Sequence, residues 1–269
     1  MTHKIAFIGA GNMASALING LLADGYPADK ITASDQLPEK RENLAGSGVH
    51  TTDDNCSAVA SADVVILAIK PQVLQAVCQE IAAAVQQAKP LVVSIAAGVT
   101  EDSLAAWLGA ETAIVRTMPN TPAMLQTGAT VLHANAHTSS QQKDIAESIL
   151  RAVGLTRWLD KESLIDAATA ISGSGPAYYF LFMEIMKRSA EEMGLDAETA
   201  HLLTLQTALG AAKMAIESND SPEILRDRVT SPGGTTEAAI KTMQSEDLEA
   251  LLKKAILKAR DRSRELSGN

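Results

Sequence analysis

Short, continuous apolar runs recur through the first 160 residues of the chain, separated by segments with helical periodicity. The first run covers residues 4–8 and passes directly into Gly9-Ala10-Gly11, after which a helical pattern begins. The runs at 64–68 and 91–95 are apolar on both faces, as expected of parallel strands that helices cover on both sides. This alternation predicts an α/β, Rossmann-type doubly wound sheet.

The other elements of this half follow the same alternation. We predict strands at 30–34, near residue 49, and at 113–116, 127–133 and 156–159, with helices at 38–46, 55–60 and 139–153. The strand at 127–133 is expected at the edge of the sheet. A further helix should begin at Pro71, because proline is favoured in the first helical turn. The α/β domain should therefore span residues 1–160.

From residue 161 onward no strand pattern remains, which predicts an all-α domain over residues 161–269. Two segments, 178–183 and 202–216, are apolar around the whole helix, and the aromatic residues at 178–183 indicate that bulk should be buried there. A helix without a polar face belongs to a large core or to an interface. A domain of about 110 residues has no large core, so we predict dimerisation through these helices. The last helix, with one apolar stripe over 248–259, should be an ordinary surface helix.

Composition narrows the classes of partner. The 269 residues carry a net charge of −9, which argues against nucleic acid or an anionic membrane as the main partner. No apolar run approaches the roughly 18 residues of a membrane span, and no secretion signal is evident, so we expect a cytoplasmic protein. Cys56 and Cys78 should be reduced structural thiols. We expect loop positions for His133 and His137, and no metal site.

The turn after the first strand has the spacing of a dinucleotide-binding motif. Gly9, Gly11 and Ala14 match G-x-G-x-x-A between a strand and a helix. Gly9 permits the turn, and Gly11 lets a pyrophosphate approach the backbone. The helix N-terminus offers N–H groups to the phosphates. A plain tight turn is the alternative interpretation.

Asp35 follows the second predicted strand, where Rossmann folds place a carboxylate that binds the ribose hydroxyls. That role would favour NAD, whereas Ser34, Lys40 and Arg41 nearby could bind a 2′-phosphate instead. Asp35 could equally cap the helix that begins near Pro38. The sequence therefore leaves the choice between NADH and NADPH open.

Unusual residues follow three further strands, at the edge where parallel sheets bind ligands. They lie at 70–71, 96–98 and 119–122. The small residues at 96–98 leave room for a flat ring or a ribose, or they form a tight turn.

Two stretches interrupt the helical half. Residues 172–176 place two glycines and a proline in a helix, which is unfavourable by propensity. This indicates either a kinked, close helix crossing or backbone exposed to the cofactor. At 231–234 the chain turns before a helix that starts near Thr235. The N–H groups there could bind a carboxylate, or the turn is a plain corner with threonine caps.

Taken together, these blocks resemble the pyrroline-5-carboxylate reductase family from end to end. The resemblance runs through residues 7–13, 69–71, 92–98, 116–122, 172–177 and 229–236. It implies NAD(P)H-dependent reduction of L-1-pyrroline-5-carboxylate to L-proline, the final step of proline biosynthesis. Hydride would pass to carbon 5 of the cyclic imine.

The resemblance also implies particular site residues. For the cofactor these are Ile8, Gly9, Ala10, Gly11, Asn12, Met13, Ser34, Asn55, Ala68, Ile69, Lys70, Pro71, Ile95, Ala96 and Ala97. For the substrate they are Ser231, Gly233, Gly234, Thr235 and Thr236, with the substrate carboxylate at the helix N-terminus. We expect the Thr236 hydroxyl to be catalytic, close to the imine nitrogen. Arg228 replaces an asparagine that touches the cofactor in some relatives, and Asn219 aligns with a substrate position that a partner subunit supplies.

The family's contact segments imply NADPH, with NADH left open, and its assemblies are homodimers that form rings up to decamers. Two alternatives remain. A β-hydroxyacid dehydrogenase resembles a different pattern, with a catalytic lysine after its glycine pair, whereas here the nearest later lysine is Lys187, roughly three turns away. A non-enzymatic dinucleotide-binding module would leave 172–176 and 231–236 unexplained.

Overall fold

The computed structural model describes residues 2–267, which form two compact units. One, here called the sheet unit, contains the chain up to Ser174 together with the residues from Ala259 onward. The other, the helical unit, is Gly175–Lys258. The domain boundary predicted at residue 160 marks the end of the strand pattern and stays a prediction.

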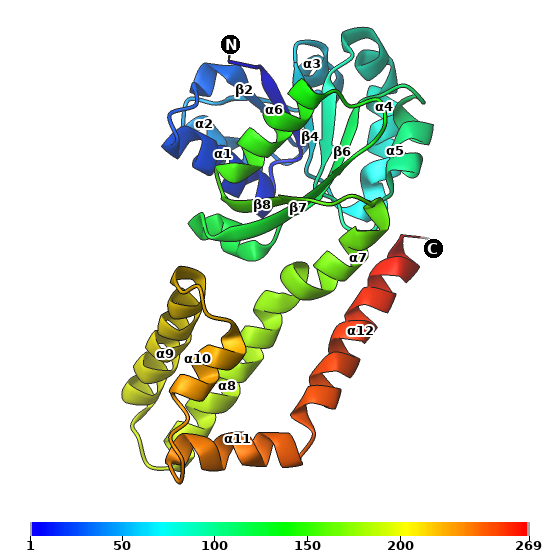
Figure 1. Ribbon diagram of the computed structural model, residues 1–269. Coiled ribbons are helices and arrows are strands. Elements are labelled where there is room, and N and C mark those ends of the chain that lie inside the picture. The colour runs from blue at the N-terminus through cyan, green and yellow to red at the C-terminus, as the bar shows by residue number, and fades with distance from the viewer. Residues whose placement is uncertain (1, 268–269) are drawn as a thin grey trace. The chain divides into compact units, whose positions relative to one another are not determined.

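The sheet unit is built on one sheet of eight strands in the order β3-β2-β1-β4-β5-β6-β7-β8 (Figure 1). The strands are β1 (Ile5–Ile8), β2 (Ile31–Ser34), β3 (His50–Thr52), β4 (Val64–Leu67), β5 (Leu91–Ser94), β6 (Ile114–Met118), β7 (Gly128–Ala134) and β8 (Gly154–Trp158). All neighbours run parallel except β6 and β7, which are antiparallel. The doubly wound α/β prediction is confirmed.

The expected position of β7 at the edge is wrong, because β8 occupies the edge and pairs with β7 in parallel. The short 3-10 turn η2 (Thr121–Leu125) joins β6 to β7 and reverses the chain, which makes that pair antiparallel. The helix α6 (Ser140–Arg151) then separates β7 from β8 and returns the chain in the same direction.

Helices cover both faces of the sheet (Figure 1). One core contains residues of α1 (Asn12–Ala23) and α6, and the other contains residues of α3 (Asn55–Ala60), α4 (Pro71–Ala88) and α5 (Glu101–Leu108). Within β1, Ile5 and Phe7 belong to the first core and Ala6 and Ile8 to the second. This explains why the strand is apolar at every position. The remaining helix between strands is α2 (Pro38–Ala45).

The break predicted at 172–176 is a π turn, η4 (Thr169–Gly173), between α7 (Ile165–Ala168) and α8 (Gly175–Glu192). The turn follows η3 (Glu162–Leu164). A Cβ at Gly173 would lie 2.7 Å from the Met118 methyl carbon, and Asn120 donates a hydrogen bond to the Ser172 carbonyl at 3.1 Å. For Gly173 the structure therefore supports close packing within the sheet unit, against the end of β6.

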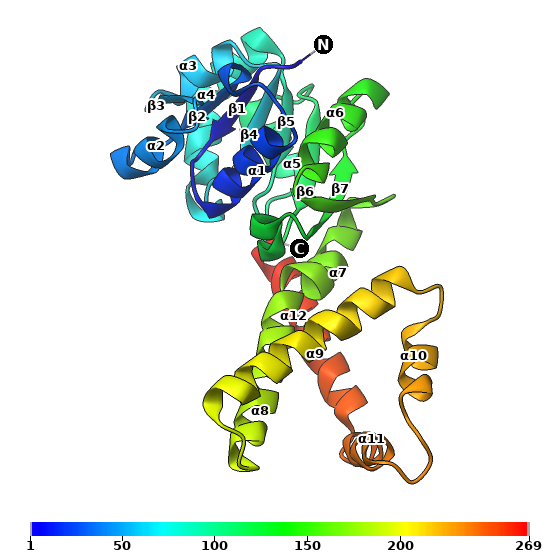
Figure 2. The same cartoon turned by 90° about the vertical axis from the view of Figure 1, so that its left-hand side faces the viewer.

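The helical unit contains all of α8, together with α9 (Ala197–Glu217), α10 (Pro222–Arg228), α11 (Thr235–Ser245) and the first part of α12 (Leu248–Leu266). The helices α8 and α9 pack against each other (Figures 1 and 2). Within this unit only Gly175, Ala200 and Thr204 are buried.

Large apolar side chains on α8 and α9 are therefore uncovered within one chain, as Phe180 (63% exposed) and Leu209 (62%) illustrate. The prediction that bulk is buried at 178–183 is wrong for the single chain. The stripe of α12 is also incompletely covered, since Leu251 is 65% exposed, so α12 is not the ordinary surface helix that we predicted. Among residues 2–267, no helix is both long and apolar enough to cross a bilayer.

Candidate functional site

The turn between β1 and α1 presents bare backbone at the carboxyl end of the sheet. Gly9 has φ +98°, and its N–H donates to the Ser34 carbonyl at 2.7 Å. A Cβ at Gly9 would lie 2.5 Å from the Ala68 carbonyl oxygen, so the turn packs tightly on the end of β4. At Gly11, the N-cap of α1, a Cβ would meet no described atom within 4 Å. The backbone here borders open space at a helix N-terminus, which suits a phosphate.

The sheet register brings the predicted cofactor-binding segments together. Ile8 lies beside Ser34 on one side and Leu67 on the other. The Ala68 N–H donates to the Ile8 carbonyl at 2.8 Å, and the Ile95 N–H donates to the Leu67 carbonyl at 3.2 Å. Residues 8–13, 68–71 and 95–97 thus follow three adjacent strands at one edge.

These residues differ in how much side chain they expose. Ile8 and Ala96 are buried, whereas Asn12, Lys70 and Pro71 are exposed. Ile8 and Ala96 can therefore offer a ligand little beyond their backbone.

Ser34 and Asn55 are also close together, but their side chains are buried. The Ser34 hydroxyl donates to Asn55 Oδ1 at 2.7 Å, and Asn55 Nδ2 donates to Glu80 at 3.2 Å. Ser34 is 0% exposed and Asn55 is 6% exposed. In this structure their polar groups bind each other and the α4 carboxylate.

Asp35 makes contacts that neither sequence interpretation predicted. Its Oδ2 accepts a hydrogen bond from the Ala10 N–H at 2.9 Å and lies 3.3 Å from the Lys40 ammonium, while Oδ1 accepts from the Leu37 N–H at 3.0 Å. Burial raises the pKa of Asp35, but these donors outweigh it and hold the pKa below its usual value. Leu37, not Asp35, is the N-cap residue of α2. The contact with Ala10 spans 25 residues, so local sequence patterns carry no signal of it.

The predicted substrate-binding residues lie in the helical unit, at the turn before α11. Gly234 is the N-cap of α11, and the first N–H groups of a helix have no intrahelical acceptor. Thr235 is exposed and Thr236 is half-buried, and among residues 2–267 neither hydroxyl has a hydrogen-bond partner. These groups are available to an anionic ligand.

Glu237 is an acidic neighbour of this turn that the sequence interpretation missed. Its carboxylate accepts a hydrogen bond from the Gly233 N–H at 2.8 Å and pairs with the Lys241 ammonium at 3.0 Å. These two contacts lower the pKa of Glu237. Nearby, the Arg228 guanidinium pairs with the Asp220 carboxylate, and the adjacent Asn219 is exposed.

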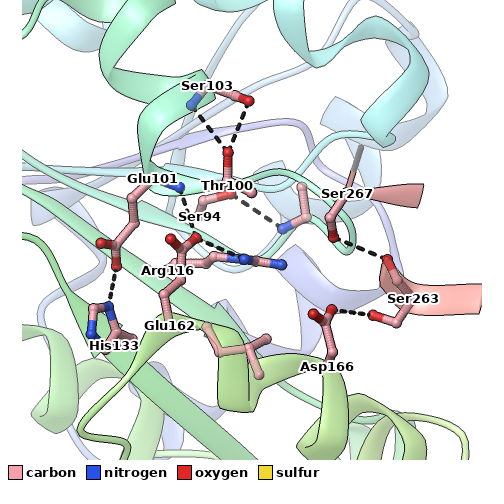
Figure 3. Close-up of polar contacts among 12 residues, drawn as sticks. Ser94, Thr100, Glu101, Ser103, Arg116, His133, Glu162, Asp166, Ser263 and Ser267 are labelled. Atoms are coloured by element: carbon pink, nitrogen blue, oxygen red, sulfur yellow. Dashed lines mark hydrogen bonds and ion pairs between the residues drawn. The ribbon is translucent and has the colours of Figure 1, made fainter. Parts of the chain in front are cut away.

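A second polar cluster lies in the sheet unit (Figure 3). Arg116 donates to Glu162 Oε1 at 2.7 Å, and the same oxygen accepts the Glu101 N–H at 2.8 Å. The Glu101 carboxylate lies 2.7 Å from His133 Nδ1. Burial raises the pKa of Glu101, against the opposing effect of His133. His133 lies within strand β7, so the loop position that we predicted for it is wrong. Through Glu162, the cluster joins η3 to the sheet.

The described residues contain no group of three or more side chains suited to a metal ion. Cys56 and Cys78 are both free thiols. Burial raises the pKa of Cys78 to about 12.

Two family models match separate parts of the chain. Residues 162–266 match the family model "Pyrroline-5-carboxylate reductase dimerisation", and residues 4–98 match "NADP oxidoreductase coenzyme F420-dependent". The curated pyrroline-5-carboxylate reductase of Pseudomonas aeruginosa is 54% identical over 99% of this chain and 97% of its own length.

Two solved structures agree with this chain over nearly their full length. A pyrroline-5-carboxylate reductase from Coxiella burnetii has a TM-score of 0.95 at 48% identity, covering 99% of both chains. The pyrroline carboxylate reductase of Plasmodium falciparum with NADP bound has a TM-score of 0.88 at 28% identity, covering 98% of both. With similarity that extends through both the turn after β1 and the turn before α11, this chain belongs to the pyrroline-5-carboxylate reductase family.

Proposed function

We propose that this chain is an NAD(P)-dependent oxidoreductase acting on a CH–NH bond, which reduces L-1-pyrroline-5-carboxylate to L-proline in proline biosynthesis. The observation that carries the proposal is the full-length similarity to pyrroline-5-carboxylate reductases, 54% identical in the example from P. aeruginosa. That similarity includes the residues of both turns described above.

The cofactor site that we propose consists of the turn at residues 8–13 with the adjoining segments 68–71 and 95–97. The open space at Gly11 and the N-terminus of α1 support a role in holding the pyrophosphate. A bound nicotinamide dinucleotide supplies the hydride. We propose NADPH as the preferred form, because the cationic side chains of Lys40 and Arg41 lie beside Asp35 and because the P. falciparum relative is described with NADP.

The substrate site that we propose is the turn formed by Ser231, Gly233 and Gly234, with Thr235 and Thr236 at the start of α11. The substrate carboxylate would accept hydrogen bonds from backbone N–H groups, each contributing about 1.5–3 kcal/mol because the acceptor is charged. The Thr236 hydroxyl, which has no partner within residues 2–267, would bind near the imine nitrogen. A protonated imine is a strong electrophile, so the task of these residues is mainly positioning.

The competing dehydrogenase function would require a lysine on the helix that follows Gly175. The nearest candidate, Lys187, pairs with Glu191 at 3.0 Å. Among residues 2–267, no contact favours that function.

We further propose that the protein works as a homodimer in the cytoplasm, assembled through α8 and α9, and that dimers associate into rings up to decamers. The match to a dimerisation family over 162–266 and the uncovered apolar side chains of α8 and α9 support the dimer.

The test follows the oxidation of NADPH by pyrroline-5-carboxylate and, separately, the reduction of NADP+ by a panel of hydroxy acids. We expect oxidation with the imine alone, and a lower KM for NADPH than for NADH. Absence of turnover with the imine would overturn the proposal. Equal KM values for the two cofactors would overturn only the preference for NADPH.

A further inference from the structure

The turn at residues 172–174 is held in place by an asparagine from the edge of the sheet. Asn120 follows β6, is buried, and donates through Nδ2 to the Ser172 carbonyl at 3.1 Å. Its Oδ1 accepts a hydrogen bond from the N–H of Ala129, in β7, at 2.8 Å. Both ends of the Asn120 amide therefore bind backbone, and the side chain joins the turn to the sheet.

A proline explains why the Ser172 carbonyl needs this donor. In an α-helix each carbonyl accepts the N–H of the residue four positions later, and for Ser172 that residue is Pro176, which has no N–H. The chain forms the π turn η4 here, in which the Ser174 N–H donates to the Thr169 carbonyl at 2.8 Å. Asn120 thus supplies the hydrogen bond that the proline removes. Such π turns are frequent at functional sites.

The turn lies beside a segment that we propose to bind the cofactor. Strand β6 runs parallel to β5, with Arg116 beside Ser94. Continuing that offset by two residues places Met118 beside Ala96. A Cβ at Gly173 would lie 2.7 Å from the Met118 methyl carbon. The turn therefore packs on the residue next to Ala96, where the sequence predicts room for a flat ring.

One hydroxyl of this turn has no partner in the fold. The Ser172 hydroxyl donates to the Ala168 carbonyl at 2.9 Å. The Ser174 hydroxyl is half-buried and has no hydrogen-bond partner among residues 2–267. A hydroxyl can both donate and accept a hydrogen bond, and a carboxamide offers an acceptor and a donor. Ser174 is therefore suited to the carboxamide of a nicotinamide ring.

We propose that Ser174 binds the nicotinamide carboxamide, and that Asn120 is a positioning residue that fixes the turn carrying Ser174 before the cofactor arrives. The proposal rests on the function proposed above and deepens it at the ring that supplies the hydride. By holding the carboxamide, Ser174 sets which face of the ring is turned to the substrate, and such orientation lowers the barrier to transfer. A preformed turn lowers the ordering cost of binding.

The experiment compares two ligands by calorimetry on the full chain without substrate. They are NADPH and 2′-phospho-ADP-ribose, a fragment of NADPH that lacks the nicotinamide ring. The variants are Ser174→Ala, Asn120→Ala and the control Asn135→Ala. Asn135 makes the same two kinds of bond at the opposite end of β6, since its amide accepts the Ile114 N–H at 3.1 Å and donates to the Thr112 carbonyl at 2.9 Å.

We expect Ser174→Ala and Asn120→Ala each to weaken NADPH about five- to tenfold and to change the affinity for the fragment by less than about twofold. Asn135→Ala should change neither ligand beyond about twofold, although it and Asn120→Ala should lower the unfolding temperature by similar amounts. If Ser174→Ala or Asn120→Ala weakens both ligands equally, or neither, the proposal is wrong. Wild-type protein that binds neither ligand would instead contradict the proposed function itself.

A double-mutant cycle tests whether Asn120 acts through the Ser172 carbonyl. Pro176→Ala restores an N–H that can bond to that carbonyl, so in this background Asn120→Ala should weaken NADPH by less than about twofold. The bond from Ala129 to Asn120 is lost in both backgrounds, and its effect cancels in the cycle. A loss of NADPH affinity that is the same with and without Pro176 would overturn the positioning role of Asn120.

Discussion

At the scale of single residues, the two proposed ligand sites share an arrangement of charges. In each, a carboxylate accepts a hydrogen bond from a glycine-rich turn and pairs with a lysine. These are Asp35 with Ala10 and Lys40, and Glu237 with Gly233 and Lys241. An acid beside a site for anions would repel its ligand if it stood alone. The paired lysine offsets that charge, and the hydrogen bond holds the turn.

Thr236→Ala tests the catalytic role proposed for the threonine hydroxyl. We expect kcat for pyrroline-5-carboxylate to fall by about ten- to a hundredfold, equivalent to about 1.4–3 kcal/mol at the transition state. Thr242→Ala is a matched control on the same helix, because its hydroxyl donates to the Ala238 carbonyl. Thr236→Ser should recover most of the activity. Unchanged kinetics in Thr236→Ala would exclude the role.

The lowered pKa of Asp35 predicts how the free energy of unfolding depends on pH. Its pKa is lower in the folded protein, so the folded state holds its proton less tightly than the unfolded chain. The stability that this carboxylate contributes is present above the unfolded pKa of about 3.9 and is lost as the pH falls through the folded value.

Urea unfolding of wild-type protein and Asp35→Asn at several pH values checks this expectation. The wild type should be more stable by about 1–2 kcal/mol at pH 7, through its charge-assisted hydrogen bonds. The difference should shrink once the pH falls below about 4. A difference that stays constant down to the lowest pH at which both proteins fold would show that the charge of Asp35 is not its source.

At the scale of elements, the turn between β1 and α1 needs its two glycines for different reasons. Gly9 has a left-handed backbone and a neighbouring carbonyl 2.5 Å from any Cβ, whereas Gly11 has φ −75° and open space. The first requirement is one of folding, and the second is one of ligand access.

Gly9→Ala should therefore lower the stability of the fold, whereas Gly11→Ala should lower the affinity for the cofactor. We expect Gly9→Ala to lower the free energy of unfolding by at least about 2 kcal/mol, from strain and steric overlap. Gly11→Ala should leave the unfolding temperature unchanged or slightly raised but weaken NADPH binding by at least about tenfold, because its methyl group enters the space for the phosphate. Thermal denaturation and calorimetry measure both. Full cofactor affinity in Gly11→Ala would place the pyrophosphate elsewhere.

At the scale of the whole molecule, one chain leaves much of its apolar surface uncovered. On α8 and α9, Phe180, Leu202 and Leu209 are each more than half exposed. Soluble monomers rarely expose contiguous apolar surface on this scale. The two segments that the sequence shows to be apolar on every side, 178–183 and 202–216, lie on α8 and α9. A single chain does not bury all of their apolar side chains.

Light scattering tests the assembly. We expect a mass at least twice the 28.3 kDa of the chain. Leu209→Glu should reduce the mass toward that of the monomer, because it buries a charge in the interface. Leu155→Glu changes a leucine on the edge strand β8 that is also more than half exposed, and its mass should match that of the wild type. A monomeric wild type would contradict the dimer.

The sequence by itself determined the features that depend on short-range geometry. The alternation of strands and helices, the helix start at Pro71 and the turn at Gly9 and Gly11 all follow from side-chain period and from backbone stereochemistry. The resemblance to a family supplied the candidate site residues, and the comparisons confirmed that family.

Only the tertiary structure decided which distant groups meet. The position of β8 at the edge, the bond from Ala10 to Asp35 and the contact of Glu101 with His133 each join segments far apart in the chain. Such contacts depend on strand register and on which side chains remain buried once helices have packed, and no local pattern encodes either. For the same reason Asp35, which the sequence presents as a ribose ligand or a helix cap, became in the folded chain a support for the turn that precedes it.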